Sequence, residues 1–370
     1  MRIGIDASRA FSDKRTGTEE YSYQIIKHIL QLPGATNHQW TLYVRSDFEF
    51  RNSNLKLNSN CKVKIIPMTR LWTQVGLALR TWLDKLDLLW IPAHTLPVLR
   101  LPTLNTLVTI HGIEYEWLPA YENPLQKLYL PLSTHYAVMS ASRIIAVSGF
   151  TKNQLLKRLH ANSKKITVVY EGVAHQVSRK TVADSRKILK KYKLQQKKYL
   201  LFIGTIQPRK NLIRLMRAFA KIDSIELKLA IVGKLGWLYD EILATPKALN
   251  LENRIVILGY LSSAERNILL QNALVYMQPS ITEGFGLPVL EAMAAGVPVV
   301  SSNGGALAEI VAKSGLTFDP YNIEDMAAKI SQVITDGKLR QQLISKGRRR
   351  VLDFSWQKAA KQTLHILEEM

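Results

Sequence analysis

The sequence predicts an α/β protein made of two doubly wound domains, each with a parallel sheet covered by helices. Two observations lead to this prediction. The chain has 370 residues, which is more than a single hydrophobic core ordinarily stabilises. Short runs rich in β-branched and aromatic residues alternate along it with longer amphipathic runs, the pattern of βα units that feed parallel sheets.

The first series of βα units is predicted to form an N-terminal domain over residues 1–178. Apolar residues recur at helical spacing between several of its strands. The predicted strands are Arg2–Ile5, Thr41–Val44, Val63–Ile66, Leu88–Ile91, Thr106–Ile110, Ile144–Val147 and Thr167–Tyr170, and the predicted helices are Glu19–Leu32, Trp72–Leu86, Leu125–Ser140 and Thr151–Leu159.

A polar, basic stretch from Glu171 to about Asp184 is predicted to link this domain to a second one, residues 179–354. The second domain would open with helix Ser185–Tyr192. Its predicted strands are Tyr199–Ile203, Lys228–Val232, Arg254–Leu258, Val275–Met277, Pro298–Ser301 and Leu316–Phe318, and the helices Ile323–Thr335, Lys338–Val351 and Ser355–Glu369 follow. We expect the last helix, about residues 355–370, to pack back on the first domain.

Composition narrows the class of protein. Cys61 is the only cysteine, so a disulfide within the chain is excluded and a reducing cytoplasm fits best. We expect neither an export signal nor a membrane span, because charged residues interrupt every apolar run before about 20 residues. The net charge of +21 favours polyanionic partners such as phosphates or anionic lipid headgroups. No nucleic-acid-binding signature accompanies it, and no nucleic-acid partner is expected.

The most informative segment runs from Gln278 to Val300, where a strand end, a glycine loop, a helix and another strand follow one another. Gly284 and Gly286 would let the backbone approach a ligand closely, and a proline suits the first turn of the helix. The N–H groups from Gly286 onward would form an anion site at a helix N-terminus, where a nucleotide's phosphates bind.

Two carboxylates flank this predicted anion site. Glu283 precedes it, and Glu291 is expected in the first turn of the helix. Each could accept hydrogen bonds from hydroxyl groups, which a sugar nucleotide offers on both sides of its diphosphate. The alternative is that Glu291 only complements the helix dipole and that Glu283 is an ordinary loop carboxylate. Their combination with the glycines favours the nucleotide-sugar site.

The segment Glu283-Gly-Phe-Gly-Leu-Pro-Val-Leu-Glu291 resembles the E-x7-E signature of glycosyltransferase family 4. These are retaining enzymes of the GT-B fold, in which two Rossmann-like domains face each other across a cleft. The resemblance implies that Glu283 contacts the donor sugar, that Glu291 contacts the ribose, and that the backbone from Phe285 to Leu287 binds the diphosphate. It also implies an acceptor-binding first domain and a donor-binding second domain.

A second motif, Phe202-Ile-Gly-Thr-Ile-Gln-Pro-Arg-Lys-Asn-Leu212, places Arg209 and Lys210 after the first strand of the second domain. The two cations could neutralise a leaving diphosphate without a metal, although such a pair is otherwise an ordinary solvated surface. Many relatives have Gly-Arg where this chain has Gly204-Thr205. The variant resembles a mannosyltransferase-like branch, which favours GDP-mannose as donor and leaves a UDP-sugar open.

Two positions in the first domain are further candidates. Gly17 would bring the loop after the first strand close to the cleft, or it belongs to a simple βα turn with Thr18 as the helix N-cap. His111 ends a predicted strand, at the sheet edge that binds ligands, and family members commonly have histidine there. Most of them follow it with Asp, whereas Gly112 stands here. His94 is a weaker candidate for the same cleft.

The sequence therefore predicts a retaining hexosyltransferase that moves a sugar, with mannose favoured, to a glycan or lipid-linked acceptor in cell-surface polysaccharide synthesis. No permanently bound cofactor and no metal are expected, because no Asp-x-Asp element or His/carboxylate cluster is visible. A GT-B nucleotide-sugar epimerase and a non-enzymatic nucleotide- or nucleic-acid-binding protein are the alternatives. The predicted catalytic residues are His111, Glu283, Arg209 and Lys210, and the predicted donor-binding residues are Gly17, Gly204, Arg209, Lys210, Glu283, Gly284, Phe285, Gly286, Leu287 and Glu291.

A lipid-linked acceptor would explain both the basic charge and the apolar stretch Leu71–Leu79. An interfacial helix there, with Trp72 and Trp82 at an anionic membrane surface, is one hypothesis. A core helix with its apolar face inward is the favoured interpretation. The protein is expected in the cytoplasm, either free or peripheral on the inner face of the plasma membrane.

Overall fold

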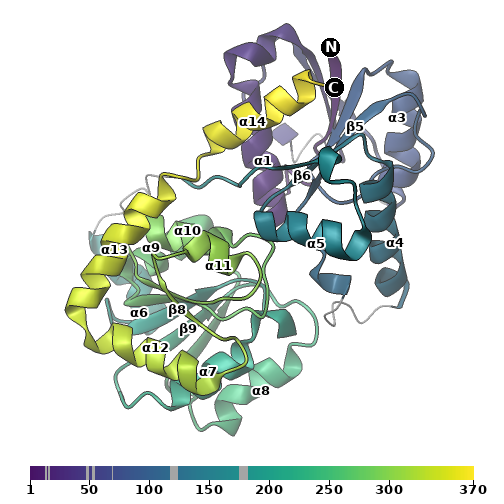
Figure 1. Ribbon diagram of the computed structural model, residues 1–370. Helices are drawn as coiled ribbons and strands as arrows, with labels where there is room; N and C mark the ends of the chain where they lie inside the picture. Colours follow the sequence, from purple (N-terminus) through teal and green to yellow (C-terminus); the bar gives the residue numbers. More distant parts are fainter. Residues whose placement is uncertain are drawn as a thin grey trace. The chain divides into compact units, whose positions relative to one another are not determined.

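The structure is a computed structural model that describes residues 1–12, 15, 17–46, 50–51, 55–68, 70–116, 124–174 and 182–370. Residues 175–181, in the middle of the predicted linker, lie outside the described residues. Contacts divide the chain into two compact units (Figure 1). Unit 1 comprises Met1–Ile113, Leu125–Gly172 and Ser355–Met370, and unit 2 comprises Glu114–Pro124 and Val173–Phe354.

Unit 1 contains a seven-stranded parallel sheet of order β3-β2-β1-β4-β5-β6-β7. The chain order reverses between β1 and β4, which pair directly through Ile3 and Leu88. The strands are β1 (Arg2–Asp6), β2 (Gln39–Val44), β3 (Cys61–Ile65), β4 (Leu88–Ile91), β5 (Asn105–Ile110), β6 (Arg143–Ala146) and β7 (Ile166–Val168).

Helices connect these strands. They are α1 (Gly17–Leu30), the 3₁₀ turn η1 (Pro33–Asn37), the π-helical turn η2 (Trp72–Leu77), α3 (Ala78–Leu83), α4 (Pro124–Ser140), α5 (Gly149–Leu159), the turn η4 (Ser163–Lys165) and α14 (Trp356–Glu368). The predicted single helix Trp72–Leu86 is therefore a π-helical turn followed by a short α-helix that ends at Leu83. Within unit 1, α14 packs against α1, and the Trp356 ring lies 5.9 Å from that of Tyr21.

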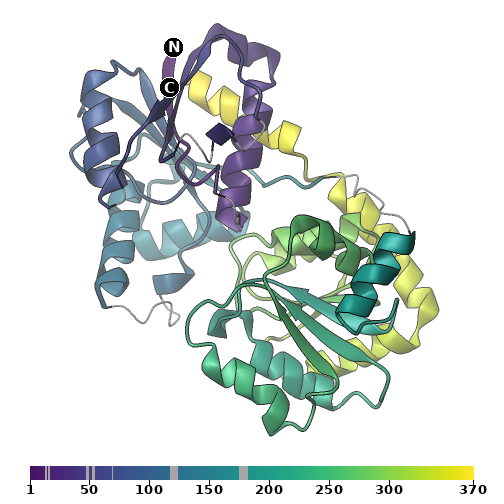
Figure 2. The ribbon, with the colours of Figure 1, turned by 180° about the vertical axis from the view of Figure 1, so that it is seen from behind.

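Unit 2 contains a six-stranded parallel sheet of order β10-β9-β8-β11-β12-β13. Figure 2 shows this sheet with helices packed around it. The strands are β8 (Tyr199–Ile203), β9 (Lys228–Val232), β10 (Ile255–Gly259), β11 (Val275–Gln278), β12 (Val299–Ser302) and β13 (Leu316–Phe318). The helical elements are η3 (Glu114–Glu116), α6 (Val182–Lys191), η5 (Pro208–Lys210), α7 (Leu212–Ala220), α8 (Asp240–Ala248), α9 (Ser263–Asn272), α10 (Leu287–Ala294), α11 (Leu307–Val311), α12 (Ile323–Thr335) and α13 (Gly337–Val351).

The core of unit 2 explains why its central strand is apolar throughout. Every residue of β8 is buried, as expected for a parallel strand covered on both faces. Phe202 packs in one cluster with Phe219 of α7 and Ile330 of α12, all of them fully buried. Each such side chain contributes roughly 1.5–3 kcal/mol when it leaves water.

The predicted fold class is confirmed. Each predicted strand corresponds to an observed one whose ends agree within two residues, and every pairing is parallel. Within the described ranges, no helix is both long and apolar enough to cross a bilayer.

Candidate functional site

The loops that carry the predicted donor residues of unit 2 leave two neighbouring strands at the same edge of the sheet. β8 pairs with β11 through Leu200 and Val275, and the chain order reverses between these strands. Ligands of open parallel sheets bind beyond the carboxyl ends of the strands at such a reversal. Arg209 and Lys210 follow β8 in η5, and Glu283 follows β11. The topology alone therefore brings these three side chains to one place.

Arg209, Lys210 and Glu283 form an ion cluster there. Nη1 of Arg209 donates to Oε2 of Glu283 and to the carbonyl oxygen of Thr282, each over 2.8 Å. Nζ of Lys210 donates to Oε1 of Glu283. Glu283 is buried, whereas Arg209 keeps about a fifth of its side chain, 22%, exposed. The cations are thus oriented by Glu283 and remain partly open to a ligand.

Two polar side chains at the end of β11 complete the surroundings of Glu283. Nε2 of Gln278 and Oγ of Ser280 donate to its Oε1 over 3.0 and 2.6 Å. Burial alone would raise the pKa of Glu283, but the charges of Lys210 and Arg209 and these hydrogen bonds lower it to about 2. Glu283 is therefore ionised at neutral pH. The cluster carries one net positive charge, the sign that a diphosphate requires.

Glu114 is a further carboxyl group of unit 2 that the sequence reasoning did not single out. Burial raises its pKa, and the charge of Arg209 opposes the shift. Its Oε1 is buried without a hydrogen-bond partner among the described residues. No local sequence signal marked this residue, because it stands outside both donor motifs.

Asn211 fixes the two loops of the cluster against each other. Its Nδ2 donates to the carbonyl oxygens of Pro279 and Pro320 over 3.0 and 2.7 Å. Its backbone is left-handed, with φ of 60°, a conformation that asparagine tolerates better than most residues. The backbone N–H of Ile281 donates to the carbonyl oxygen of Arg209 over 2.9 Å. Asn211 belongs to the motif that runs from Phe202 to Leu212, but the sequence did not predict a role for it.

Gly305 allows a close approach to the Glu283 loop that the sequence reasoning also missed. Its φ is 65°, and a Cβ atom there would lie 2.5 Å from the carbonyl oxygen of Glu283. The next residue, Ala306, donates its N–H to the same oxygen over 2.8 Å. A side chain at Gly305 would displace the backbone that holds the carboxylate.

The glycine loop after Glu283 leads into α10 as predicted. Gly286 is the N-cap, with φ of 111°, and no side chain caps the helix. Leu287 is the first helical residue and Gly284 lies in the loop, while the buried Phe285 packs edge-on against Phe354 at 5.8 Å. Amides at an uncapped helix N-terminus favour an anion.

Glu291 differs from its prediction in one respect. It is the fifth residue of α10 and therefore lies beyond the first turn, because the helix begins at Leu287 and not earlier. It forms an ion pair with Arg266 of α9 over 3.2 Å. Both Glu291 and Glu283 raise the pKa of the buried Tyr276 hydroxyl, after the larger effect of burial. Both glutamates are thus close enough to Tyr276 of β11 to act on its hydroxyl.

Gly204 directly follows β8, at the carboxyl edge of the sheet. Its N–H donates to the carbonyl oxygen of Val232 over 2.9 Å, and a Cβ atom there would lie 2.8 Å from the Phe202 ring. Its role in donor binding stays a prediction.

In unit 1, His111 follows β5 at the carboxyl edge of the sheet. Its Nδ1 lies 3.1 Å from Oε1 of Glu171 and its Nε2 lies 2.9 Å from the carbonyl oxygen of Pro92. Tyr21 packs edge-on against the ring at 4.6 Å. Glu171 was predicted to begin the linker. It is instead a buried part of unit 1, because its carboxylate pairs with this imidazole.

The other candidates of unit 1 lie near the same edge or at the start of a helix. The His94 ring centre is 5.6 Å from that of His111, and burial lowers the pKa of His94 well below its ordinary value, assisted by His111. Gly17 is the first residue of α1, with open space where a Cβ atom would project. The positions of His94 and Gly17 do not by themselves assign a function to either residue.

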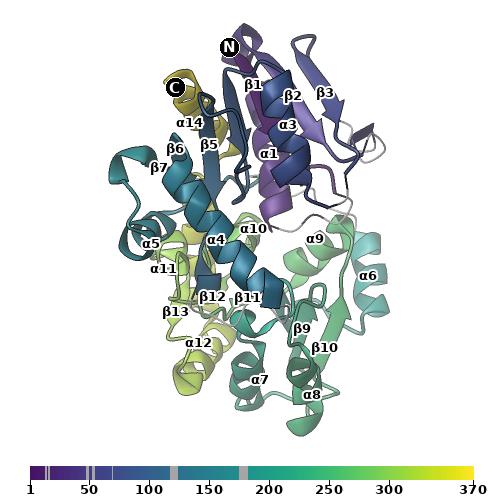
Figure 3. The ribbon, with the colours of Figure 1, turned by 90° about the vertical axis from the view of Figure 1, so that its right-hand side faces the viewer.

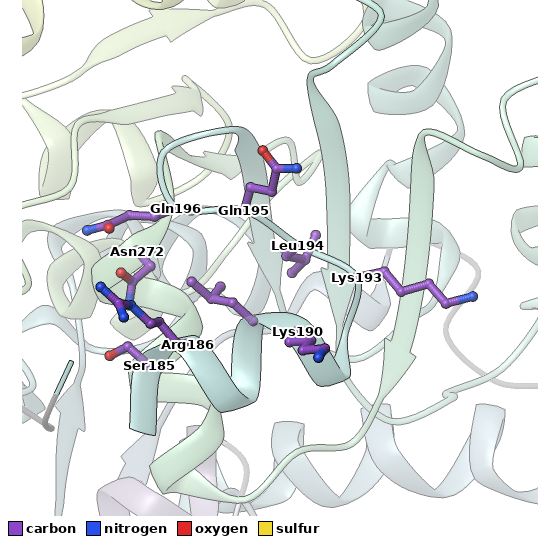
Figure 4. A pocket seen from close by; sticks show the side chains of 9 residues that line it. Ser185, Arg186, Lys190, Lys193, Leu194, Gln195, Gln196 and Asn272 are labelled. Atoms are coloured by element: carbon purple, nitrogen blue, oxygen red, sulfur yellow. The ribbon is translucent and has the colours of Figure 1, made fainter. Parts of the chain in front are cut away.

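A separate groove of about 690 Å³ lies in unit 2 (Figure 4). It contains none of the predicted site residues. Its lining consists of Ser185, Arg186, Leu189, Lys190, Lys193, Leu194, Gln195, Gln196 and Asn272. Among the described residues, no group of three or more His, Cys, Asp or Glu side chains is arranged to hold a metal ion.

Two doubly wound parallel-sheet units, one of them carrying one glutamate before a glycine-capped helix and a second within it, define a glycosyltransferase of the GT-B class. The sequence pattern of the family described as "Glycosyl transferases group 1" matches residues 184–350, and that of "Glycosyltransferase Family 4" matches residues 33–177. The chain belongs to glycosyltransferase family 4, in a mannosyltransferase-like branch.

Two curated relatives illustrate the branch. The chain is 30% identical to O-antigen chain mannosyltransferase B of Escherichia coli over 264 residues, which cover 70% of this chain and 69% of the relative. It is 28% identical to O-antigen chain mannosyltransferase RfbU of Salmonella typhimurium over 241 residues, which cover 65% of this chain and 63% of the relative.

Among solved structures, Anabaena HepE in complex with UDP-glucose superimposes with a TM-score of 0.79 at 18% identity, over 100% of both chains. At this identity the likeness shows the fold.

Proposed function

We propose that the protein transfers a hexose, with mannose favoured, from a nucleotide sugar to a glycan or lipid-linked acceptor in cell-surface polysaccharide synthesis. The observation that carries this proposal is the cluster of Arg209, Lys210 and Glu283 at the β8/β11 edge, beside the glycine-capped start of α10. In the proposal, unit 2 binds the donor and unit 1 binds the acceptor.

The charges of the cluster suit a diphosphate. Arg209 presents a planar fork and Lys210 a compact charge, and the N-terminus of α10 adds a partial positive charge. A donor diphosphate would share these cations with Glu283, whose oxygens would then be available to the sugar hydroxyls. Because the side chains and the helix supply the positive charge, the proposed reaction needs no metal.

The nature of the donor is proposed from the relatives. Two of them are named as mannosyltransferases of O-antigen chains, which supports mannose and surface-polysaccharide synthesis. The Anabaena relative holds UDP-glucose, which supports a nucleotide sugar. We favour GDP-mannose and take a UDP-sugar as the second candidate. Glu291 would bind the ribose, as the family signature implies.

The proposed mechanism is a front-face displacement with retention at the anomeric carbon. The bond from that carbon to the phosphate oxygen breaks as the bond to the acceptor oxygen forms on the same face. The acceptor's proton passes to the leaving phosphate, and Arg209 and Lys210 stabilise its charge. His111 would lie beside the reacting sugar. A trapped covalent glycosyl-enzyme would contradict this mechanism.

Two alternatives predict different products. A nucleotide-sugar epimerase would convert the donor without an acceptor, so product analysis separates it from a transferase. A nucleic-acid-binding protein would show an affinity for DNA that falls steeply with salt and no response to sugar nucleotides.

The test is a panel of GDP-, UDP-, ADP- and dTDP-sugars, read by thermal stabilisation and by release of nucleoside diphosphate. Glu291→Ala serves as the site variant and the exposed Glu252→Ala as the matched control. One donor that stabilises and turns over, with loss only in Glu291→Ala, would support the proposal. No response to any donor would overturn it.

A further inference from the structure

Unit 1 carries an exposed apolar surface that the glycosyltransferase site does not use. Its side chains are between 47 and 75% exposed and come from η2 and α3, from the loop around residues 96–101, and from α4. Figure 3 shows α3 and α4 on the near side of unit 1. We call this surface the apolar face; it consists of Leu71, Val75, Leu79, Trp82, Leu83, Val98, Leu99, Tyr129 and Leu132.

The spacing along η2 and α3 shows that the exposure is systematic. Leu71, Val75, Leu79 and Trp82 recur at intervals of four, four and three residues and form one outward stripe. Residues of the opposite side, including Trp72, are buried. An ordinary surface helix pairs a buried apolar stripe with a polar outer face, whereas this segment is apolar on both sides.

Hydrogen bonds hold the three segments of the apolar face together. Oε1 of Gln74 accepts from the N–H of Val98 over 2.9 Å, and its Nε2 donates to the hydroxyl of Tyr129 over 3.3 Å. Nε1 of Trp82 donates to the carbonyl oxygen of Leu99 over 2.9 Å. The face is therefore a pre-formed surface, and apolar surfaces of this extent mark interaction sites.

Positive charges predominate on the segments of the apolar face. Residues 50–83, 88–113 and 124–170 contain no aspartate or glutamate. Asp84 is already paired with Lys64 and Asp87 with Arg2. Cations stand on the same segments and beside them, namely Arg70, Arg80, Arg100, Lys164 and Lys165, and Lys165 donates to the carbonyl oxygens of Met139 and Ala141 at the end of α4.

We propose that the apolar face binds an anionic lipid bilayer, with its leucines and Trp82 inserted among the acyl chains and the cations on phosphate headgroups. Apolar anchors combined with cations are the features that hold a protein in a membrane interface. A second copy of the chain fits less well, because a symmetric contact would bring the same cations together. Trp72, predicted as a membrane anchor, is wrong for that role because it is buried and donates to the carbonyl oxygen of Ile66.

The experiment measures sedimentation of the full chain with phosphatidylcholine vesicles, with and without phosphatidylglycerol. Leu79→Glu/Trp82→Glu tests the apolar anchors, and Ile225→Glu/Leu352→Glu, on exposed residues of unit 2, is the matched control. Arg70→Gln/Arg80→Gln tests the cations, with Lys338→Gln/Lys346→Gln as the control of equal charge change. Thermal melting shows that each variant is folded. Stabilisation by nucleotide, whose proposed diphosphate site lies in unit 2, separates this proposal from the proposed function.

We expect binding that requires phosphatidylglycerol. It should fall at least about tenfold in Leu79→Glu/Trp82→Glu and about fivefold per removed cation in Arg70→Gln/Arg80→Gln, and the controls should bind as the wild type does. Wild-type protein that stays in the supernatant with anionic vesicles would overturn the proposal. Equal binding by Leu79→Glu/Trp82→Glu would also overturn it. So would a dimer that dissociates in this variant without any lipid binding.

Discussion

His111 and Glu171 form a buried pair at the carboxyl edge of the unit 1 sheet, with Nδ1 of the ring 3.1 Å from Oε1 of the carboxylate. The other ring nitrogen faces the carbonyl oxygen of Pro92. Both ring nitrogens thus lie within hydrogen-bond distance of an oxygen atom, which orients the ring. Glu171 thereby positions a candidate catalytic residue.

Replacing Glu171 with glutamine should leave the fold intact and weaken the contact that orients the His111 ring. We expect the turnover number to fall roughly 10- to 100-fold, with nucleotide affinity unchanged because the proposed diphosphate site lies in unit 2. The ¹⁵N shift of the His111 Nδ1 atom should change, because its carboxylate partner is lost. The exposed Glu226→Gln is the control. Unchanged ring shifts in Glu171→Gln would show that the carboxylate does not contact the ring.

Glu283→Gln should destabilise the protein in a pH-dependent way. The pKa of this carboxyl falls from an ordinary 4.5 to about 2 in the fold, so its contribution is complete above about pH 4.5 and is lost as the pH falls towards 2. The shift corresponds to roughly 3 kcal/mol, or roughly 6 to 12 °C in the melting temperature.

Melting curves of the wild type and Glu283→Gln between pH 2 and 8 check this expectation. The two curves should differ most near neutrality and converge at the acid end. A constant difference at every pH would mean that the ion cluster with Arg209 and Lys210 is not the cause.

The sequence predicted the sheets well because parallel, fully buried strands leave a strong local pattern. β8 is apolar at every position and lies where that pattern placed it. The Arg209–Lys210 pair and Glu283 could also be anticipated, because their loops follow neighbouring strands of a predictable topology.

The features that the sequence did not predict depend on contacts between residues that are far apart in the chain. Glu171 lies 60 positions from His111, and no local signal tells which carboxylate meets the ring. Trp72 and Trp82 both belong to an apolar stretch, and only the packing decides that the first is buried and the second exposed. The start of α10, and with it the position of Glu291 beyond the first turn, depends on the backbone at Gly286.

Gly305→Ala should damage the donor site without touching a charged residue. The added Cβ would lie 2.5 Å from the carbonyl oxygen of Glu283, at a left-handed φ of 65°. We expect nucleotide affinity to fall by about tenfold or more, since both the clash and the strain act on the Glu283 loop. Gly337→Ala, where the nearest atom is 3.5 Å away on a flexible arginine, is the control and should bind normally. Equal affinities in the two variants would refute the role of this close approach.

Substitutions of Asn211 separate backbone strain from lost hydrogen bonds. Asn211→Gly keeps the left-handed backbone but loses the bonds to Pro279 and Pro320, at a cost of roughly 1 kcal/mol each. Asn211→Ala loses the same bonds and should be less stable than Asn211→Gly by about 1 kcal/mol. Urea unfolding measures both variants. An alanine variant as stable as the glycine variant would show that the φ of 60° is not maintained.

The central claim is that the β8/β11 edge of unit 2 binds the diphosphate of a sugar-nucleotide donor. Calorimetric titration of nucleoside diphosphates and the matching monophosphates into wild type, Arg209→Gln and Arg217→Gln tests it most directly, because Arg217 is an exposed residue of the adjacent helix α7. We predict that Arg209→Gln weakens binding of the preferred diphosphate by roughly 10- to 100-fold, weakens the monophosphate much less, and that Arg217→Gln changes neither. A diphosphate affinity that is the same in wild type and Arg209→Gln, or absent from both, would contradict the claim.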